Sequence, residues 1–588
     1  MRGKTESGRD ELRSVLREGR TLFVAVAVFS FFVNLLMLTG PIFMLQVYDR
    51  VLSSRSEATL VALTVIMAFL FLMMGVLDYA RGRVLARAGA RFQARLDNRV
   101  FEAILRRSVS PVERARPATG LRDLESIQRL MSGPAPFAVF DMPWTPVFLA
   151  AIFMFHWILG CIAIAGGLLL VCLTWMNQVF SKKLQLDANV ASSQSEGFTE
   201  AVRSQGETVQ GLGMRRSVLE RWQKLRGRSL ETTIQASDRT GGFSTASKTL
   251  RFFLQSLMLG AGAWLAIQGE LSPGSMIAGS ILMGRALAPI EQAIGQWALV
   301  QRAMQGWKSL VELLDKTPAP EERTKLPQPR SILEAQQVTV VAPGEQTAAI
   351  RMVSFRMEPG QAMGVIGPSA SGKSTLAKAI TGIWKPAAGN VRLDGAALEQ
   401  YGDDDLGRHI GYLPQEIALF DGTVAENIAR LTGAPDSAAI VEAARRAGAH
   451  EMILGLPGGY DYQVAAGGGK LSGGQRQRIG LARALYGDPA VVVLVFTSGY
   501  VSNWATLGTL GEKIPGLIIF SDALNHAIQD IKALGKAVII MAHRPAAIQH
   551  CDLILMMEDG VRKAFGPKDE VLRQHVRNYP QVVTPAGE

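Results

Sequence analysis

Long stretches almost free of charged residues dominate the first half of this chain of 588 residues. Residues 136–180, for example, contain a single charge, that of Asp141. A helix needs about 20 apolar residues to cross a bilayer. Six stretches reach this length, and they cover roughly residues 22–44, 59–80, 136–156, 157–180, 250–269 and 273–297. We therefore expect a helical membrane domain of six spans over residues 22–315, preceded by a short N-terminal segment, residues 1–21, whose pattern is helical.

The sixth stretch is the weakest, because Arg285 and Glu291 interrupt it. Its small residues suit a helix that packs against other helices; they are Gly274, Ala278, Gly279 and Gly284. Charges inside a membrane span either pair with one another or mark a transport pathway, and the sequence does not choose between these roles.

The distribution of charge predicts the orientation in the membrane. Only 19% of the residues are charged, and of the net charge of +11, residues 1–330 carry +13 and the remainder −2. The long connections, 81–135 and 181–249, carry +7 and +4, whereas the short ones near 45–58, 156–157 and 270–272 are neutral or slightly acidic. Because Lys and Arg accumulate on the cytoplasmic side, we place the N-terminus, both long connections and the C-terminal half in the cytoplasm; the resemblance described below implies that the membrane is the inner membrane of a bacterium. Nucleic-acid binding is disfavoured, since the basic stretches alternate with spans and lack interleaved aromatic residues.

A second domain begins after a proline-rich linker. Residues 316–331 contain four prolines among charged residues, a composition typical of linkers. Beyond it, over 332–588, short β-branched runs such as 338–342 alternate with helical patterns such as 437–449. This alternation predicts an α/β domain with a mostly parallel core sheet.

The strongest motif of this domain follows an apolar strand at 362–366. Residues 367–375 match the phosphate-binding pattern GxxxxGK[ST] between a strand and a helix. Glycines let backbone N–H groups turn toward phosphate oxygens, and the following helix offers its positive end. Lys373 would reach the β- and γ-phosphates, and the Ser374 hydroxyl would bind Mg²⁺. The residues predicted to hold ATP are Gly367, Ser369, Ser371, Gly372, Lys373, Ser374 and Thr375.

A second glycine motif, Leu-Ser-Gly-Gly-Gln over 471–475, precedes a predicted helix at 475–486. Together with the phosphate-binding loop, it resembles the signature of the ATP-binding cassette (ABC) family. In that family the signature of one subunit closes over ATP held by the other subunit. The resemblance therefore implies a homodimer in which ATP is also contacted, in trans, by Ser472, Gly473, Gly474 and Gln475.

Two further positions fit the ABC family. Gln415, in Tyr-Leu-Pro-Gln over 412–415, resembles the glutamine that contacts Mg²⁺ and senses the membrane domain. His543 follows the apolar strand 537–540 and resembles the histidine that contacts the γ-phosphate. For His543 alone, an ordinary capping role is the alternative. The expected fold is thus a six-span ABC exporter domain fused to a cytoplasmic α/β P-loop cassette, with ATP and Mg²⁺ as cofactors.

Finer similarities point to the exporters of type I secretion systems. They are the segments 40–51, 141–148 and 211–214, and the pair Arg221-Trp222. The resemblance implies a periplasmic adaptor protein, an outer-membrane channel and a secreted protein with a C-terminal signal as partners, besides the lipid bilayer. An exporter of lipids or small peptides with the same architecture is the alternative.

One stretch departs from the ABC pattern. After the strand 489–494, the family has an Asp that orders Mg²⁺ and a Glu that activates water, whereas this chain has Val495 and Phe496. Residues 494–527 instead resemble a fragment of 5-aminolevulinate synthase, a pyridoxal-phosphate enzyme. Either a recombination or assembly chimera or a natural insertion in a degenerate cassette accounts for this stretch. A bifunctional enzyme is disfavoured, because about thirty residues cannot form a pyridoxal site. The chain is therefore also a candidate for an ATP-binding protein that hydrolyses ATP poorly.

Overall fold

A computed structural model describes residues 7–110, 119–319, 323–465, 468–496, 515–541 and 548–575, with the side chains of Asp403 and of residues 515–523 left aside. The chain divides into two compact units. The first consists of Met1–Ser108 and Glu113–Ala319, and the second of Val109–Val112 and Pro320–Glu588. The helical first unit and the α/β second unit confirm the predicted fold class.

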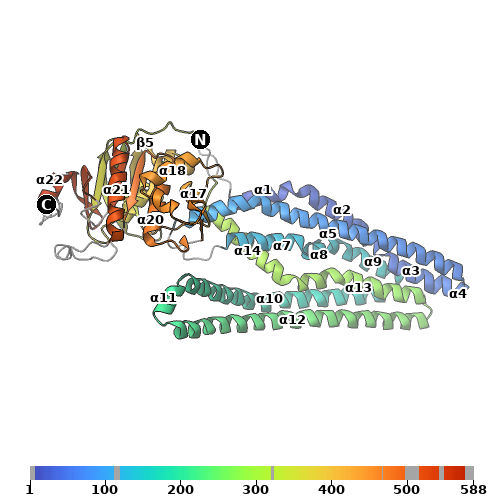
Figure 1. Ribbon diagram of the computed structural model, residues 1–588. Helices are drawn as coiled ribbons and strands as arrows, with labels where there is room; N and C mark the ends of the chain where they lie inside the picture. Colours follow the sequence, from blue (N-terminus) through green and yellow to red (C-terminus); the bar gives the residue numbers. More distant parts are fainter. Residues whose placement is uncertain are drawn as a thin grey trace. The chain divides into compact units, whose positions relative to one another are not determined.

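The first unit is built from helices (Figure 1). The longer ones are α1 (Gly8–Glu18), α2 (Arg20–Leu36), α3 (Thr39–Gln46), α5 (Glu57–Arg107), α7 (Gly120–Ser132), α8 (Ala135–Asp141), α9 (Thr145–Phe155), α10 (Trp157–Ser204), α12 (Arg215–Ile267), α13 (Pro273–Gly295) and α14 (Trp297–Lys316). The shorter elements among its described residues are the π-helix η1 (Val47–Val51), α4 (Leu52–Ser54), the 3₁₀-helix η2 (Met142–Trp144) and α11 (Gly206–Gly211). The helical pattern expected for the N-terminal segment is confirmed by α1.

Five helical segments among the described residues are long and apolar enough to cross a membrane. They are Arg20–Ser54, Glu57–Arg107, Ala135–Phe155, Trp157–Ser204 and Arg215–Ile267. The sixth predicted span is the helix α13 of 23 residues, which is not among these five, since Arg285 and several glycines and serines lower its mean hydropathy. The sixth span therefore stays a prediction.

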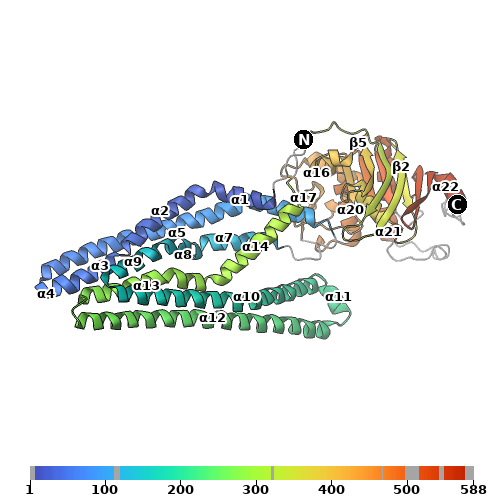
Figure 2. The ribbon, with the colours of Figure 1, turned by 180° about the vertical axis from the view of Figure 1, so that it is seen from behind.

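Much of the charged connections continues the apolar helices. The helix α5 runs through about the first half of the first Arg-rich connection, and α10 and α12 extend through the second until α11 joins them. Figure 2 shows α10 and α12 lying side by side along their whole length. Side chains cap the starts of α5 and α10: the Oγ of Ser56 accepts from Thr59 N at the start of α5, and the Nδ1 of His156 accepts from Ile158 N at the start of α10.

A buried ion pair explains why Asp141 stands alone in its uncharged stretch. Its Oδ1 accepts from Arg81 Nη1 at 2.9 Å and from Asn34 Nδ2 at 2.7 Å. Arg81 also donates to Asp78 Oδ1 at 2.6 Å and lies over the Phe137 ring. Buried charges are costly unless they are paired and hydrogen-bonded. This network therefore joins α2, α5 and α8 at one fixed point.

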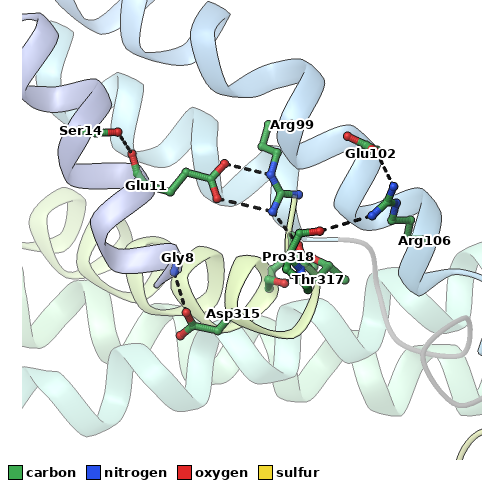
Figure 3. Close-up of polar contacts among 10 residues, drawn as sticks. Gly8, Glu11, Ser14, Arg99, Glu102, Arg106, Asp315, Thr317 and Pro318 are labelled. Atoms are coloured by element: carbon green, nitrogen blue, oxygen red, sulfur yellow. Dashed lines mark hydrogen bonds and ion pairs between the residues drawn. The ribbon is translucent and has the colours of Figure 1, made fainter. Parts of the chain in front are cut away.

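A second polar cluster fastens the N-terminal helix to the end of α14 (Figure 3). Glu11 accepts from Arg99 Nε at 2.9 Å, and Arg99 Nη2 donates to the Thr317 carbonyl at 2.6 Å. The backbone N–H of Gly8 donates to Asp315 Oδ1 at 2.6 Å. Leu12 is fully buried in the apolar cluster beside these contacts. The helix α1 thus holds α5 and the last turn of α14 together.

The second unit contains two main sheets. A six-stranded sheet has the order β12-β11-β3-β10-β9-β6, and a four-stranded antiparallel sheet has the order β2-β1-β4-β5. Strands β6, β9, β10, β3 and β11 are parallel, and β12 is antiparallel. The strands are β1 (Leu333–Val341), β2 (Ala348–Met357), β3 (Ala362–Ile366), β4 (Ala388–Leu393), β5 (Ala396–Ala397), β6 (Ile410–Leu413), β7 (Gly422–Thr423), β8 (Gln463–Val464), β9 (Val491–Val495), β10 (Ala537–Met541), β11 (Leu553–Glu558) and β12 (Val561–Pro567).

Helices cover both faces of the parallel sheet. They are α15 (Lys373–Ile380), α16 (Asp403–His409), α17 (Val424–Ile428), α18 (Ser437–Arg446), α19 (His450–Leu454), α20 (Gly473–Leu485), α21 (Pro515–Ala533) and α22 (Lys568–His575), with the 3₁₀-helices η3 (Leu398–Gln400) and η4 (Gly459–Asp461). The helices α18, α20 and α21 share an apolar cluster with one face of β9 and β10, whereas α15 shares a cluster with the other face. Because helices cover both faces of β9 and β10, the side chains on both faces of these strands are buried. This accounts for the continuous apolar runs of their sequences.

Candidate nucleotide-binding site

The phosphate-binding loop lies between the buried strand β3 and the helix α15, as the sequence predicts. Two glycines are required by its shape. A Cβ on Gly367 would lie 2.2 Å from the Met557 carbonyl oxygen, and Gly372 has a φ of 92° with Ile350 Cγ2 only 2.5 Å from an added Cβ. Because the first N–H groups of a helix have no partner within it, those at the start of α15 are available to an anion. The loop therefore fits the phosphates of a nucleotide.

Lys373 is the charged group of this loop. It is 7% exposed, and its Nζ donates to the carbonyls of Gly367 at 2.8 Å and Pro368 at 2.7 Å, and to Ser371 Oγ at 3.3 Å. Burial lowers the pKa of Lys373 to about 8. No carboxylate in the described ranges pairs with its ammonium group. A phosphate would supply the missing negative charge.

The other predicted residues of the loop differ in exposure. Ser369 and Ser374 are exposed, Thr375 is half-buried and Ser371 is buried. The Ser374 hydroxyl, at the first turn of α15, is thus free to bind a phosphate-bound Mg²⁺. Ser371, in contrast, supports Lys373 from inside the loop. This internal role for Ser371 was not evident from the sequence, because it depends on the folded conformation of the loop.

Val495 and Phe496 lie at the end of β9, where the family acids are expected. Val495 pairs with Met541 of β10, and Met541 pairs with Val365, two residues before the phosphate-binding loop. Val495 is 6% exposed in the cluster that α15 covers. The N–H of Phe496 donates to the Met541 carbonyl at 3.0 Å, and its ring packs against the cluster on the opposite face. Hydrocarbon therefore fills this position, and neither side chain can bind Mg²⁺ or accept a proton.

The signature motif forms the exposed start of α20. Ser472 caps the helix, with its Oγ accepting from Gln475 N at 3.3 Å, while Gln475 Oε1 accepts from Ser472 N at 2.8 Å. Apart from the chain neighbours and the backbone of α20 itself, nothing in the described part of the chain lies within 4 Å of a Cβ added to Gly473 or Gly474. A second molecule can therefore approach these backbone N–H groups closely. Since α20 and α15 cover opposite faces of the sheet, the arrangement suits contact in trans.

Gln415 lies in the exposed segment after β6, and β6 pairs with β9. The carboxyl ends of β3, β9 and β6 thus carry the phosphate-binding loop, Val495 with Phe496, and Gln415, the usual location for ligands on parallel sheets. His543 follows β10 in the sequence but lies outside the described residues, as do 497–514, which form most of the unusual segment. The roles of Gln415 and His543 stay predictions.

Comparisons with known proteins agree with this architecture. The family profile "ABC transporter transmembrane region" matches residues 23–288, and the profile "ABC transporter" matches residues 350–494. The type I secretion system ATP-binding protein PrsD of Rhizobium meliloti is 42% identical over 580 residues, which cover 98% of this chain and 97% of that protein. The toxin RTX-I translocation ATP-binding protein of Actinobacillus pleuropneumoniae is 28% identical and covers 94% of this chain and 76% of its own length.

Among solved structures, a bacterial Atm1-family ABC exporter with ATP bound has a TM-score of 0.76 at 19% identity, covering 97% of this chain and 99% of its own. That likeness concerns the fold. Relatedness over the full length to PrsD carries the family assignment. The chain belongs to the ABC transporters, in the family of type I secretion system ATP-binding proteins.

Proposed function

We propose that this protein is the ATP-driven component of a type I secretion system, which exports proteins across the inner membrane. The observation that carries the proposal is the intact phosphate-binding loop in a chain similar, along 98% of its length, to PrsD. The apolar helices and the family place the protein in the inner membrane with a cytoplasmic ATP-binding domain. Export of lipids or small peptides is the rival within the same architecture.

In this function, two copies of the chain hold each ATP between them. The phosphate-binding loop of one copy, with Lys373 and Ser374, would bind the phosphates and Mg²⁺. The exposed Ser472, Gly473 and Gly474 of the second copy would cover the γ-phosphate through the positive end of α20. Gln415 would contact the Mg²⁺ and His543 the γ-phosphate. A periplasmic adaptor, an outer-membrane channel and a secreted protein with a C-terminal signal complete the proposed system.

A specific observation favours a second function, that of a cassette that binds ATP but hydrolyses it poorly. Val495 and Phe496 supply hydrocarbon where chemistry needs two carboxylates. The family match also ends at residue 494, where the resemblance to 5-aminolevulinate synthase begins. In this function the chain would close around ATP and remain closed, because a general base contributes about 10²–10⁴-fold to such reactions.

Reconstituted secretion tests both functions. The full chain is produced in a Gram-negative host with the adaptor, the channel and a secreted protein from the same genome, and the secreted protein is measured in the medium. A matched chain with Val495→Asp and Phe496→Glu is compared. Secretion by the restored chain alone supports an exporter whose hydrolysis is impaired. Secretion by both chains contradicts the impairment, and secretion by neither, with both chains in the membrane, contradicts protein export.

A further inference from the structure

A crevice lies where the polar helix α1 turns into the apolar helix α2, beside α5 (Figure 1). Its apolar lining consists of Val15, Leu16, Phe23, Phe92 and Met131. Phe23 belongs to the apolar run of α2, so one wall of the crevice is part of a membrane span. Two arginines of α5, Arg91 and Arg95, also line it. The crevice thus combines a wall in contact with the bilayer and two cationic donors.

The crevice lies on the cytoplasmic side of the membrane. Gly8 of α1 donates to Asp315 in the last turn of α14, which leads into the cytoplasmic ATP-binding unit. On α5, Tyr79 is 65% exposed, and its hydroxyl accepts from Arg83 Nη1 at 2.8 Å. Tyrosine gathers at the boundary between membrane and water. The arginines that follow Tyr79 on α5 therefore face the headgroups and the cytoplasm.

The surface around the crevice is positively charged. Exposed arginines recur every four residues on α5 and at similar spacing on α1 and the start of α2. They are Arg83, Arg87, Arg91 and Arg95 on α5, and Arg13, Arg17 and Arg20 on α1 and α2. Residues 7–20 and 79–98 together hold nine arginines and four acids, a net charge of +5. In the part of the chain that the structure describes, Arg87 and Arg91 have no hydrogen-bonding or ionic partner.

The contact between Arg95 and Glu18 can be exchanged for another. Arg95 Nε lies 3.6 Å from Glu18 Oε2, and both side chains are more than half exposed. Exposed ion pairs contribute little to stability, whereas arginine binds phosphate strongly through two parallel hydrogen bonds. Arg91 lies one helical turn from Arg95 on the same stripe. Both guanidinium groups are therefore available to one anion at the crevice.

The size of the crevice limits which anion fits. Its enclosed space is only about 10 Å³, roughly enough for one water molecule, so no whole ligand is enclosed. A phospholipid can place its phosphate on the arginines while its acyl chain stays in the bilayer along Phe23. A soluble phosphate would meet the same charges but leave the apolar wall unused. Clusters of four to eight arginines or lysines at the cytoplasmic end of a membrane helix attract anionic lipids.

We propose that the crevice between α1, α2 and α5 binds an anionic phospholipid of the cytoplasmic leaflet, such as phosphatidylglycerol. Arg91 and Arg95 donate to its phosphate, and the start of an acyl chain lies along Phe23. The other exposed arginines draw anionic lipids to this surface. The bound lipid fastens the junction of α1 and α2 to α5. This inference goes beyond the proposed export and holds whatever the chain transports.

Titration of the purified full chain with phosphatidylglycerol, followed by native mass spectrometry, tests the proposal. Each arginine near an anionic lipid surface contributes about fivefold in affinity. Arg91→Gln combined with Arg95→Gln should therefore weaken binding of the first lipid by about 25-fold. The matched control is Arg226→Gln with Arg228→Gln, two exposed arginines of α12 that lie well before its apolar part. Equal affinities of the two double variants would overturn the proposal.

A change at Glu18 should act in the opposite direction, which a loss of folding cannot imitate. Glu18→Gln frees Arg95 and removes a negative charge beside the phosphate. The affinity for phosphatidylglycerol should rise by up to about fivefold, the most that an exposed ion pair typically contributes. An unchanged or lower affinity would contradict the exchange of partners at Arg95 and with it the proposed phosphate contact.

Two further ligands identify the source of the phosphate. Phosphatidylcholine, which has the same phosphate but no net charge, should bind at least about fivefold more weakly than phosphatidylglycerol. Soluble glycerol phosphate, at the same concentration as the lipid, should not displace it. Equal binding of phosphatidylcholine would overturn the preference for anionic lipid, and displacement by glycerol phosphate would show a site for a soluble anion instead. Because no measurement needs ATP hydrolysis or secretion, the results are independent of the proposed function.

Discussion

The ends of β3 and β9 lie in the same sheet, with β10 between them, yet they differ in what their residues can do. At the end of β3, glycines, Lys373 and hydroxyl groups form a polar loop suited to phosphate. At the end of β9, Val495 and Phe496 continue the apolar core. Backbone pairing continues through both ends. The sheet thus needs only apolar side chains and backbone hydrogen bonds at these strand ends, whereas ATP hydrolysis needs carboxylates that the fold does not require.

The largest effect is expected when two acids are introduced at the end of β9, so that both strand ends carry polar groups suited to ATP hydrolysis. With Val495→Asp and Phe496→Glu, we expect ATP hydrolysis by the full chain to rise about 10²–10⁴-fold, as expected for a recovered general base. Phosphate release in nanodiscs measures the rate, and Val495→Asp with Phe496→Gln is the control that lacks the base. Ordinary turnover in the unaltered chain, abolished by Lys373→Ala, would refute the impairment.

Removing the charge of Lys373 at the end of β3 should deprive that strand end of its main phosphate-binding group. For Lys373→Ala we expect a loss in ATP affinity of about 10–100-fold, since hydrogen bonds to charged groups contribute about 1.5–3 kcal/mol. Binding of a fluorescent ATP analogue to the full chain measures it. Lys385→Ala, a change of an exposed lysine in the same unit, is the control. Equal affinities of the two variants would contradict the assignment of the phosphate-binding loop.

Shortening the side chain of Val495 at the end of β9 should destabilise the ATP-binding unit, because this residue lies in its apolar core. Val495→Ala is expected to destabilise the ATP-binding unit by about 2 kcal/mol, from lost burial and the cavity left behind. Ser369→Ala at the exposed side of the other strand end should change stability little. Thermal unfolding of the full chain, followed by calorimetry, compares the two. A stable Val495→Ala variant would mean that Val495 does not belong to the core.

The smallest expected effect concerns pH at the end of β3. Burial lowers the pKa of Lys373 to about 8 in the free protein, and bound phosphates would raise it again. Binding therefore takes up a proton, and affinity should fall as the pH rises through 8. Between pH 7 and pH 9 the loss should approach about tenfold, in line with linkage of one proton. The Lys373→Ala variant should lack this slope, and a parallel slope in both proteins would assign it to another group.

Much of this architecture could be predicted from sequence because its signals are local. The apolar stretches predicted the membrane helices, and the glycine pattern around Lys373 predicted a cradle whose close contacts Gly367 and Gly372 require. The strand end at Val495 could also be placed, since the residues before it form a continuous apolar run.

The partners of isolated charges could not be predicted, because they come from distant parts of the chain. Asp141 belongs to the segment 141–148 that resembles type I secretion exporters, but its partners Asn34 and Arg81 lie 107 and 60 residues away along the chain. The sequence also left the role of Glu291 open, and the structure pairs it with Arg251 of α12. The charged stretches between the spans were interpreted as connections from their charge alone. In the structure, the helices α5, α10 and α12 continue from the apolar segments into these charged stretches.

The contacts between α1 and α14 have a consequence for the order in which the parts of the chain assemble during synthesis. Gly8 and its partner Asp315 are 307 residues apart, so at ribosomal rates α1 waits roughly 15–60 s for α14 to be made. During that time Leu12, which ends fully buried, has no complete site to occupy. The packing of α1 against α14 is thus a late event in the assembly of the protein. Alterations at the first residues of the chain should accordingly appear as slow assembly before they appear as altered transport.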